Sequence, residues 1–317
     1  MTLTYLDAAA LRDAIDERTA VAVLEEALRT DVDPEHDSPR LFSDAPAGQF
    51  LLMPTAGKRY SGVKLATIAP DNPAAGKPKI QGVYTLFDSG TLSPLILMDG
   101  AELTLTRTPA TTALAVKHLL AADPRRRGDA ARRAGAVVVF GAGPQAWRHI
   151  LAVHAVAPID SVAIVGRTPE KADALVRRCM ELGLDARPGS AADVAGADVV
   201  LCVSSASEPL FDANLVQPHA VVAAVGSHGL DAREIDPELA RRADVVVEGR
   251  ASAMRESGDL IPARSVEEWQ EHGLTNLAEL VHGELARRAD RPALFTGVGM
   301  SWEDLAVATA VYEGQLP

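Results

Sequence analysis

The first third of the chain combines helical periodicity with short extended runs. Between residues 7 and 29, apolar side chains recur at helical spacing, and Asp7 stands where an N-cap is expected. Short β-like runs separated by turn residues follow at Phe50–Met53, Gly62–Ile68, Gly82–Phe87 and Pro94–Met98. The pattern predicts one or two helices followed by an antiparallel or mixed sheet.

The pattern next predicts a helix and a linker. A helix is expected to begin at Thr108, with Pro109 in its first turn, where a missing N–H costs nothing. It is expected to end near Ala122. The segment Asp123–Gly135 contains three consecutive arginines and is expected to be a solvated linker between domains.

From residue 136 the pattern changes to continuous apolar runs that alternate with helical segments. The runs are typical of buried strands and lie at 136–143, 161–166, 197–204, 220–226 and 243–249. Helices are expected between them at Pro144–Ala155, Pro169–Leu182 and Pro237–Arg242. This alternation predicts a parallel sheet covered on both faces.

The predicted fold class is therefore α/β, with a Rossmann-type parallel-sheet domain and a second, α+β domain. A length of 317 residues is typical of two compact domains. The expected boundaries give residues 1–120 to the α+β domain and 121–293 to the Rossmann domain. The tail, 294–317, is expected to join the first domain through an apolar helix at Leu305–Tyr312.

Composition limits the cellular location and the binding partners that we expect for the protein. The formal charge of −12 disfavours a nucleic acid or an anionic membrane as partner. Cys179 and Cys202 form no disulfide framework, and the N-terminus lacks an apolar signal core, so a cytoplasmic location is expected. The eight histidines lack zinc-ligand spacing, so no metal is expected.

The clearest functional signal in the sequence is a turn that contains two glycines. The strand that ends at Phe140 runs directly into Gly141-Ala142-Gly143-Pro144-Gln145-Ala146, and a helix follows. The first glycine permits a tight turn, the second lets the backbone approach a pyrophosphate, and the small Ala146 allows close packing of helix on strand. The helix N-terminus then favours the phosphate charge. The turn predicts a dinucleotide site; a plain Gly-rich turn is the alternative.

The end of the second strand favours NADP over NAD. NAD enzymes place a carboxylate here for the ribose 2′-hydroxyl, whereas this chain has Arg167 and Thr168. A guanidinium can pair with a 2′-phosphate. The alternative is that Arg167 faces solvent and Thr168 only caps the next helix. Further candidates for contact with the cofactor stand at other predicted element ends: Thr108, Ser204, Ser205, Val225 and Gly226.

Several separated segments, in order, resemble the ornithine cyclodeaminase/mu-crystallin family. They include GVKLATIAPDNP (62–73), VVVFGAGPQAWRHI (137–150), EIDPELARRADVVVEGR (234–250) and GVGMSWEDLAVA (297–308). The resemblance implies a homodimer with a Rossmann domain, and a substrate and dimerisation domain built from the N-terminal part and the C-terminal tail. It also implies NAD(P) chemistry on small amino or imino acids.

The resemblance assigns three basic residues to the substrate carboxylate. Arg40, Lys64 and Arg107 match the family positions that bind it, and Lys64 is also the candidate proton donor. The local sequence supports this assignment. Lys64 lies within an apolar strand and Arg107 directly before an expected helix start, and solubilising charges are unusual at such positions. The alternative is that Lys64 and Arg107, and likewise Arg40 in its loop, pair with an internal carboxylate.

Two departures from the family pattern bear on the substrate. Leu51, two residues before the pocket residue Met53, stands where cyclodeaminases carry the Glu that meets the distal amine of ornithine. An apolar residue cannot pair with a buried ammonium, so ornithine is disfavoured. The second departure is His228, which stands where the family has an aspartate. Its imidazole can act as general acid or base, and Asp231 is the alternative candidate for this role.

The sequence thus predicts an NAD(P)H-dependent oxidoreductase acting on a small α-imino or α-amino acid, of the ketimine reductase or amino-acid dehydrogenase type. Two alternatives stay open. One is a cyclodeaminase that recycles bound NAD, and the other is a non-catalytic protein that binds a small ligand together with NADPH.

Overall fold

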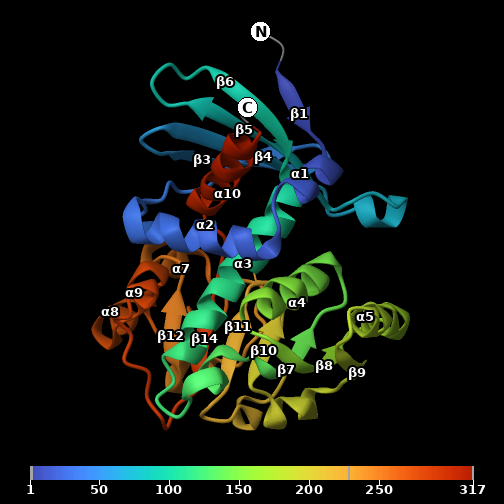
Figure 1. Cartoon of the computed structure of the whole chain (residues 1–317), viewed down its shortest axis with the longest axis vertical. Coiled ribbons are helices and arrows are strands. Elements are labelled where there is room, and N and C mark those ends of the chain that lie inside the picture. The colour runs from blue at the N-terminus through green and yellow to red at the C-terminus, as the bar shows by residue number, and fades with distance from the viewer. Residues whose placement is uncertain (1–2, 228, 316–317) are drawn as a thin grey trace. The chain divides into compact units, whose positions relative to one another are not determined.

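The computed structural model describes residues 3–227 and 229–315 and divides into two compact units (Figure 1). The first unit comprises residues 1–108 and 300–317, and the second comprises 109–299. The chain therefore begins and ends in the same unit. Each unit is described by itself below.

The first unit is built on a six-stranded sheet. Its order is β1-β6-β5-β4-β3-β2, antiparallel throughout except that β1 runs parallel to β6. The strands are β1 (Thr4–Leu6), β2 (Leu41–Ala45), β3 (Gly48–Ala56), β4 (Tyr60–Ile68), β5 (Ile80–Asp88) and β6 (Pro94–Asp99). The predicted strands are all present, and the sheet is mixed.

The helices of the first unit follow the predicted apolar spacing. Asp7 caps the first helix by accepting from the N–H groups of Ala9 and Ala10, as expected. The elements are α1 (Ala8–Ala14), α2 (Glu17–Thr30), α10 (Ser301–Gly314), the start of α3 (Gly100–Ala121), and the short 3₁₀ helices η1 (Pro34–His36) and η2 (Asn72–Ala75). Figure 1 shows α10, the C-terminal helix, lying along β3, β4 and β5.

A distant side chain caps α10. Its N-cap position, Met300, offers no hydroxyl or carboxylate, but the Asp37 carboxylate accepts from the Ser301 N–H at 2.9 Å, the Ser301 hydroxyl at 2.7 Å and the Trp302 N–H at 3.2 Å. The free N–H groups of a helix start need such acceptors. The cap therefore ties the last helix to the loop before β2.

The strand register sorts the side chains of this sheet into two faces. Met98, Tyr84, Lys64 and Met53 lie opposite one another across β6, β5, β4 and β3, and all four are buried. Because successive residues of a strand point to opposite faces, they form one row on the covered face. Continuing the pairing of β2 with β3 by one residue places Arg40 opposite Met53, at the end of this row.

The second unit contains an eight-stranded sheet in which every strand pair is parallel. Its order is β13-β12-β14-β11-β10-β7-β8-β9. The strands are β7 (Gly135–Phe140), β8 (Ile159–Val165), β9 (Asp185–Pro188), β10 (Val199–Cys202), β11 (Val221–Ala224), β12 (Asp244–Val247), β13 (Thr275–Asn276) and β14 (Ala293–Thr296). From β9 through β7 to β11 and β14, this is the doubly wound order of dinucleotide-binding folds.

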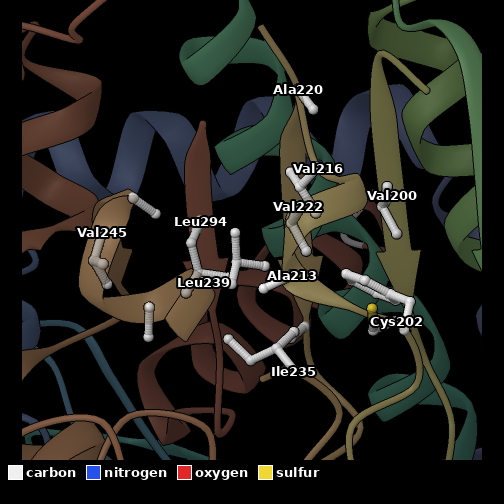
Figure 2. Packing of buried hydrophobic residues seen from close by; sticks show 14 of the residues in the cluster. Val200, Cys202, Ala213, Val216, Ala220, Val222, Ile235, Leu239, Val245 and Leu294 are labelled. Atoms are coloured by element: carbon white, nitrogen blue, oxygen red, sulfur yellow. The ribbon is translucent and has the colours of Figure 1, made fainter. Parts of the chain in front are cut away.

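Helices and short 3₁₀ turns connect these strands. They are α4 (Pro144–Val156), α5 (Pro169–Glu181), α6 (Pro237–Arg242), α7 (Arg250–Glu256), α8 (Val266–His272), α9 (Leu277–Val281), η3 (Gly128–Arg132), η4 (Ala191–Gly196), η5 (Ala213–Leu215) and the rest of α3. Figure 2 shows Ile235 and Leu239 packed against Val222 and Leu294 of the central strands. Aliphatic side chains make up most of this core, together with the aromatic rings of Phe140, Phe211 and Trp269.

Helix α3 begins earlier than the sequence predicted. It starts at Gly100 rather than Thr108, so Pro109 lies inside it. Proline removes one backbone hydrogen bond from a helix interior, but almost every side chain from Ala110 to Leu120 is buried, and this packing outweighs the loss. The position of Arg107 directly before a helix start was therefore wrong, because Arg107 lies within the helix.

The boundaries between the units also differ from the expected ones. The first unit ends at Thr108 instead of residue 120, and it resumes at Met300 instead of residue 294. The second difference arises because Ala293–Thr296 forms β14, which pairs with both β11 and β12 in the parallel sheet.

The expected solvated linker after α3 contains a buried ionic cluster. The Asp123 carboxylate is buried and accepts from Nε of Arg125 at 2.8 Å, and the fully buried Arg287 lies 3.4 Å away. Arg126 pairs with Asp198 at 2.5 Å. The segment belongs to the second unit, so its interpretation as a linker was wrong: Arg125 neutralises the buried Asp123, and Arg126 pairs with the half-buried Asp198.

The described part of the chain contains neither a membrane-spanning helix nor a metal cluster. None of its helices is long and apolar enough to cross a membrane. Within residues 3–227 and 229–315, no group of three or more His, Cys, Asp or Glu side chains is arranged to hold a metal ion.

Candidate functional site

The first unit buries Lys64 against a carboxylate. Lys64 lies in the middle of β4 and is 3 % exposed. Its Nζ lies 2.7 Å from Oδ2 of Asp304 in α10 and donates to the Thr104 hydroxyl at 3.3 Å. A buried ammonium requires such partners because desolvation is costly.

Arg107 is the second buried cation, and it also has an acidic partner. Its Nη1 donates to Oε2 of Glu303 at 2.5 Å, and its Nε lies 3.4 Å from Oδ1 of Asp304. Arg107 and both carboxylates are buried. The ion pair with an internal carboxylate, left open by the sequence, is therefore present for both cations.

The three basic residues form one electrostatic cluster. Burial lowers the pKa of Lys64 to about 8; Asp304 opposes this shift, while the positive charges of Arg107 and Arg40 add to it. Arg40 is half-buried at the end of the row of residues on the covered face. The structure thus brings the predicted carboxylate-binding residues together, and it holds the pKa of Lys64 close to neutrality.

Apolar side chains flank this cluster. Leu51 and Met53 of β3 pack with Ala66 of β4 in a small buried cluster, against which Ile68 also packs. Met53 is directly opposite Lys64, and Leu51 is opposite Ala66. The side chains beside the ammonium group on this face of β3 are therefore aliphatic.

Glu303 and Asp304 were missed by the sequence analysis. The signal was available: they are adjacent acidic residues inside the apolar helical stretch that begins at Ser301. Both are fully buried. The tail was expected to join the first domain, but only the fold shows that this helix packs against the strand that carries Lys64.

The glycine turn of the second unit has the geometry expected for a phosphate site. Gly141 has φ +136°, and a Cβ there would lie 2.7 Å from the Val203 carbonyl oxygen, so only glycine fits. A Cβ at Gly143 would meet nothing within 4 Å. Gly143 is the N-cap of α4, with Pro144 at the start of the helix and no side-chain cap. The uncapped N–H groups of this 13-residue helix therefore fit an anionic group.

Two candidate cofactor residues meet at the neighbouring strand ends. Arg167, which follows β8, donates from Nη2 to the hydroxyl of Ser205, which follows β10, at 3.2 Å. Arg167 is exposed. Thr168 is the N-cap of α5 but makes no side-chain cap hydrogen bond, so its hydroxyl is not used by the helix.

The ends of β10 and β11 are joined by a carboxylate that the sequence analysis did not identify. Glu234 accepts from the N–H groups of Ser204 and Gly226, each at 2.6 Å. Val225, the residue between β11 and Gly226, is buried. Of the two catalytic candidates nearby, Asp231 is exposed, and His228 lies outside the described residues.

A glycine turn at the first crossover of a doubly wound sheet defines a dinucleotide-binding protein, and the buried cation cluster suits a carboxylate-bearing substrate. Comparison of the chain with known protein families supports this conclusion. The chain belongs to the ornithine cyclodeaminase/mu-crystallin family, whose model matches residues 8–316. The predicted family and fold class are confirmed.

Relatives and solved structures define the class further. The chain is 33% identical to a Δ1-pyrroline-2-carboxylate reductase of Bacillus cereus, with 83% of this chain and 80% of that protein covered. It is 31% identical to the ketimine reductase mu-crystallin of Mus musculus, with 79% and 74% covered. A Thermococcus litoralis Δ1-pyrroline-2-carboxylate reductase, solved with NADH and L-proline, superposes with a TM-score of 0.85 at 26% identity, covering 98% and 97%. The predicted enzyme class, an NAD(P)-dependent oxidoreductase acting on carbon–nitrogen bonds, is confirmed.

The pairing of Lys64 with Asp304 leads to a first prediction. Replacing Asp304 by Asn removes the negative charge that raises the Lys64 pKa, so this pKa is expected to fall below about 8. NMR titration of lysine labelled with ¹³C at Cε measures it. The control is Asp31→Asn, which removes the partner of the exposed Lys58. A Lys64 pKa that does not change in Asp304→Asn would contradict the assignment.

Proposed function

We propose that the protein reduces a small cyclic α-imino acid bearing one carboxylate, of the Δ1-pyrroline-2-carboxylate type, with a reduced nicotinamide dinucleotide. The observation that carries the proposal is the cluster formed by the buried Lys64 and Arg107 with the half-buried Arg40, beside an aliphatic wall. The relatives named above are reductases of this class.

The charge of the cluster supports a substrate with one carboxylate. Arg40, Lys64 and Arg107 contribute three positive charges, and Glu303 and Asp304 contribute two negative charges. The cations attract a substrate carboxylate through charge-assisted contacts, and the two buried acidic side chains beside them repel any further carboxylate.

The aliphatic wall supports an apolar ring. Leu51 and Met53 are 9 % and 3 % exposed and pack against Ala66. A free ammonium at the far end of ornithine would lose its hydration against these side chains without gaining an acceptor from them. The carbon skeleton of a five- or six-membered ring makes favourable apolar contacts there instead.

In this proposal Lys64 supplies the proton. The bound dinucleotide supplies the hydride that adds to the imine carbon. The imine nitrogen must then gain one proton, and the Lys64 ammonium, with a pKa of about 8, is largely protonated at pH 7 and acidic enough to donate it. Arg40 and Arg107 hold the carboxylate, which fixes the orientation of the C=N bond.

The second prediction tests this function. With NADPH or NADH, the wild-type protein is expected to reduce Δ1-pyrroline-2-carboxylate and Δ1-piperideine-2-carboxylate, followed by loss of absorbance of the reduced nicotinamide. Lys64→Met, which removes the ammonium but keeps the length, is expected to lose about a hundredfold or more in kcat. The rate of the wild type is expected to fall as the pH rises above about 8, because Lys64 loses its proton.

The control for this prediction is Lys58→Met, which changes an exposed lysine in the same unit and is expected to keep full activity. Equal rates for Lys64→Met and the wild type would refute the role of Lys64. Release of ammonia from ornithine or lysine without net oxidation of the cofactor would instead favour a cyclodeaminase.

We also propose that NADP(H) is preferred over NAD(H). The support is Arg167, an exposed guanidinium at the end of β8, where a carboxylate is needed for the 2′-hydroxyl of NAD. The Ser205 hydroxyl beside it provides a second donor for a 2′-phosphate.

The third prediction concerns this preference. Arg167→Ala is expected to lower kcat/KM for NADPH about tenfold, because it removes a charge-assisted contact to the 2′-phosphate, and to leave NADH within about twofold. Steady-state kinetics with both cofactors measure the ratio. Arg177→Ala, on the exposed surface of α5, is the control. A parallel loss with both cofactors would count against the assignment.

We further propose that the protein is a homodimer formed through the uncovered face of the six-stranded sheet. Leu41, Leu52, Leu65 and Val83 lie opposite one another on that face. Leu41 and Leu65 are 55 % and 36 % exposed, and contiguous apolar surface of this kind is typical of a contact between proteins.

The fourth prediction tests the dimer. Leu65→Asp places a charge in the middle of the apolar face and is expected to convert a dimer into a monomer, measured as mass by light scattering after size-exclusion chromatography. Met180→Asp, which changes an exposed apolar residue on α5, is the matched control. A Leu65→Asp protein that keeps the dimer mass would place the interface elsewhere.

A further inference from the structure

Two buried carboxylates occupy the sheet edge of the second unit beyond β10 and β11. Glu234 lies between β11 and α6, and Asp259 lies just after α7. They are 0 % and 1 % exposed. Burial raises the pKa of both carboxyls, that of Glu234 to about 7. Such groups are costly to bury, so their contacts indicate what they hold in place.

Glu234 uses its two oxygens on two different strand ends. Oε1 accepts from the N–H of Ser204, two residues after β10, and Oε2 accepts from the N–H of Gly226, two residues after β11, both at 2.6 Å. One side chain therefore fixes the spacing of two adjacent loops at the carboxyl edge.

Asp259 holds Glu234 and the end of the second loop. Its Oδ1 accepts from the Glu234 N–H at 2.7 Å and the Ile235 N–H at 3.1 Å, and its Oδ2 accepts from the Ser227 hydroxyl at 2.5 Å. The loop after β11 is therefore fixed at two consecutive residues, Gly226 and Ser227.

The junction has no free space. A Cβ on Gly226 would lie 2.0 Å from the Ser204 carbonyl oxygen and 2.6 Å from Oε1 of Glu234. The two loops are in direct backbone contact, so even a methyl group would force them apart. A small change at Glu234 is therefore transmitted to both loops.

These loops follow the strands that form the second half of the doubly wound sheet. In such folds the half that begins with the glycine turn binds the adenosine part, and the strands beyond the switch point, here β10 and β11, border the nicotinamide part. The loop after β10 also reaches Arg167 through the Ser205 hydroxyl, whereas the loop after β11 follows a strand one place further from β8. Glu234 therefore acts on the nicotinamide side through Gly226 in particular.

We propose that Glu234 is a positioning residue for the nicotinamide half of the dinucleotide, acting through the backbone of Ser204 and Gly226, with Asp259 holding Glu234 in place. The inference rests on dinucleotide binding by the proposed function. It separates two roles within the second unit: the glycine turn binds the phosphates, and Glu234 sets the loops that receive the ring.

The fifth prediction uses Glu234→Gln. The amide offers one acceptor, and its NH₂ group faces a backbone N–H, so one buried donor loses its partner. Isothermal titration calorimetry is expected to show about tenfold weaker binding of NADH. The binding of ADP-ribose, which lacks the nicotinamide, is expected to stay within about twofold, and neither probe carries the 2′-phosphate assigned to Arg167 and Ser205. Glu238→Gln, a change at an exposed carboxylate of α6, is the control and is expected to match the wild type for both probes.

If Glu234→Gln does not fold, a second variant tests the same proposal. Ser227→Ala removes only the hydroxyl that donates to Asp259 and is expected to weaken NADH binding about threefold, again without affecting ADP-ribose. Equal losses for both probes would show a merely structural role and overturn the proposal, and so would unchanged NADH binding. A wild-type protein that binds both probes but reduces no imine would contradict the proposed function and leave this inference standing.

Discussion

Burial of charge on the covered face of the six-stranded sheet constrains the whole first unit. Lys64 and Arg107 are almost inaccessible to solvent, and each pairs with a carboxylate from the helix that ends the described chain. Leaving either cation without its partner would cost several kcal/mol. The C-terminal helix must therefore return to the strand of Lys64. Asp37, 264 residues away in sequence, caps that helix at Ser301 and helps to hold it there.

In the second unit, buried carboxylates hold the loops at the edge of the parallel sheet. The backbone N–H groups of these loops lie beyond the strand-to-strand hydrogen bonds, and the carboxylates accept hydrogen bonds from them instead. Glu234 joins the loops after β10 and β11, and Glu248 accepts from the N–H groups of Val298 and Gly299 after β14. Glycines at the contacts leave room for these acidic side chains, as at Gly297, where a Cβ would lie 2.5 Å from Oε1 of Glu248.

Much of the candidate site was predictable because its signals are local. The glycine turn requires only a strand, a tight turn and a helix in succession, and Lys64 is conspicuous as a charge inside an apolar strand. The start of α3 was not predictable from its proline, because burial of the helix outweighs one missing hydrogen bond. Glu303 and Glu234 were missed for another reason: each contacts residues that are distant in the sequence.

The sequence by itself determined the alternation of strands and helices, the dinucleotide turn, the basic residues and the family. These depend on periodicity, on backbone freedom at glycine and on residue type, all of which are local properties. Only the tertiary structure decided which charges meet. It paired Lys64 with Asp304 and Asp123 with Arg287, because only the folded chain brings such distant groups within Coulombic range and removes the water that would screen them.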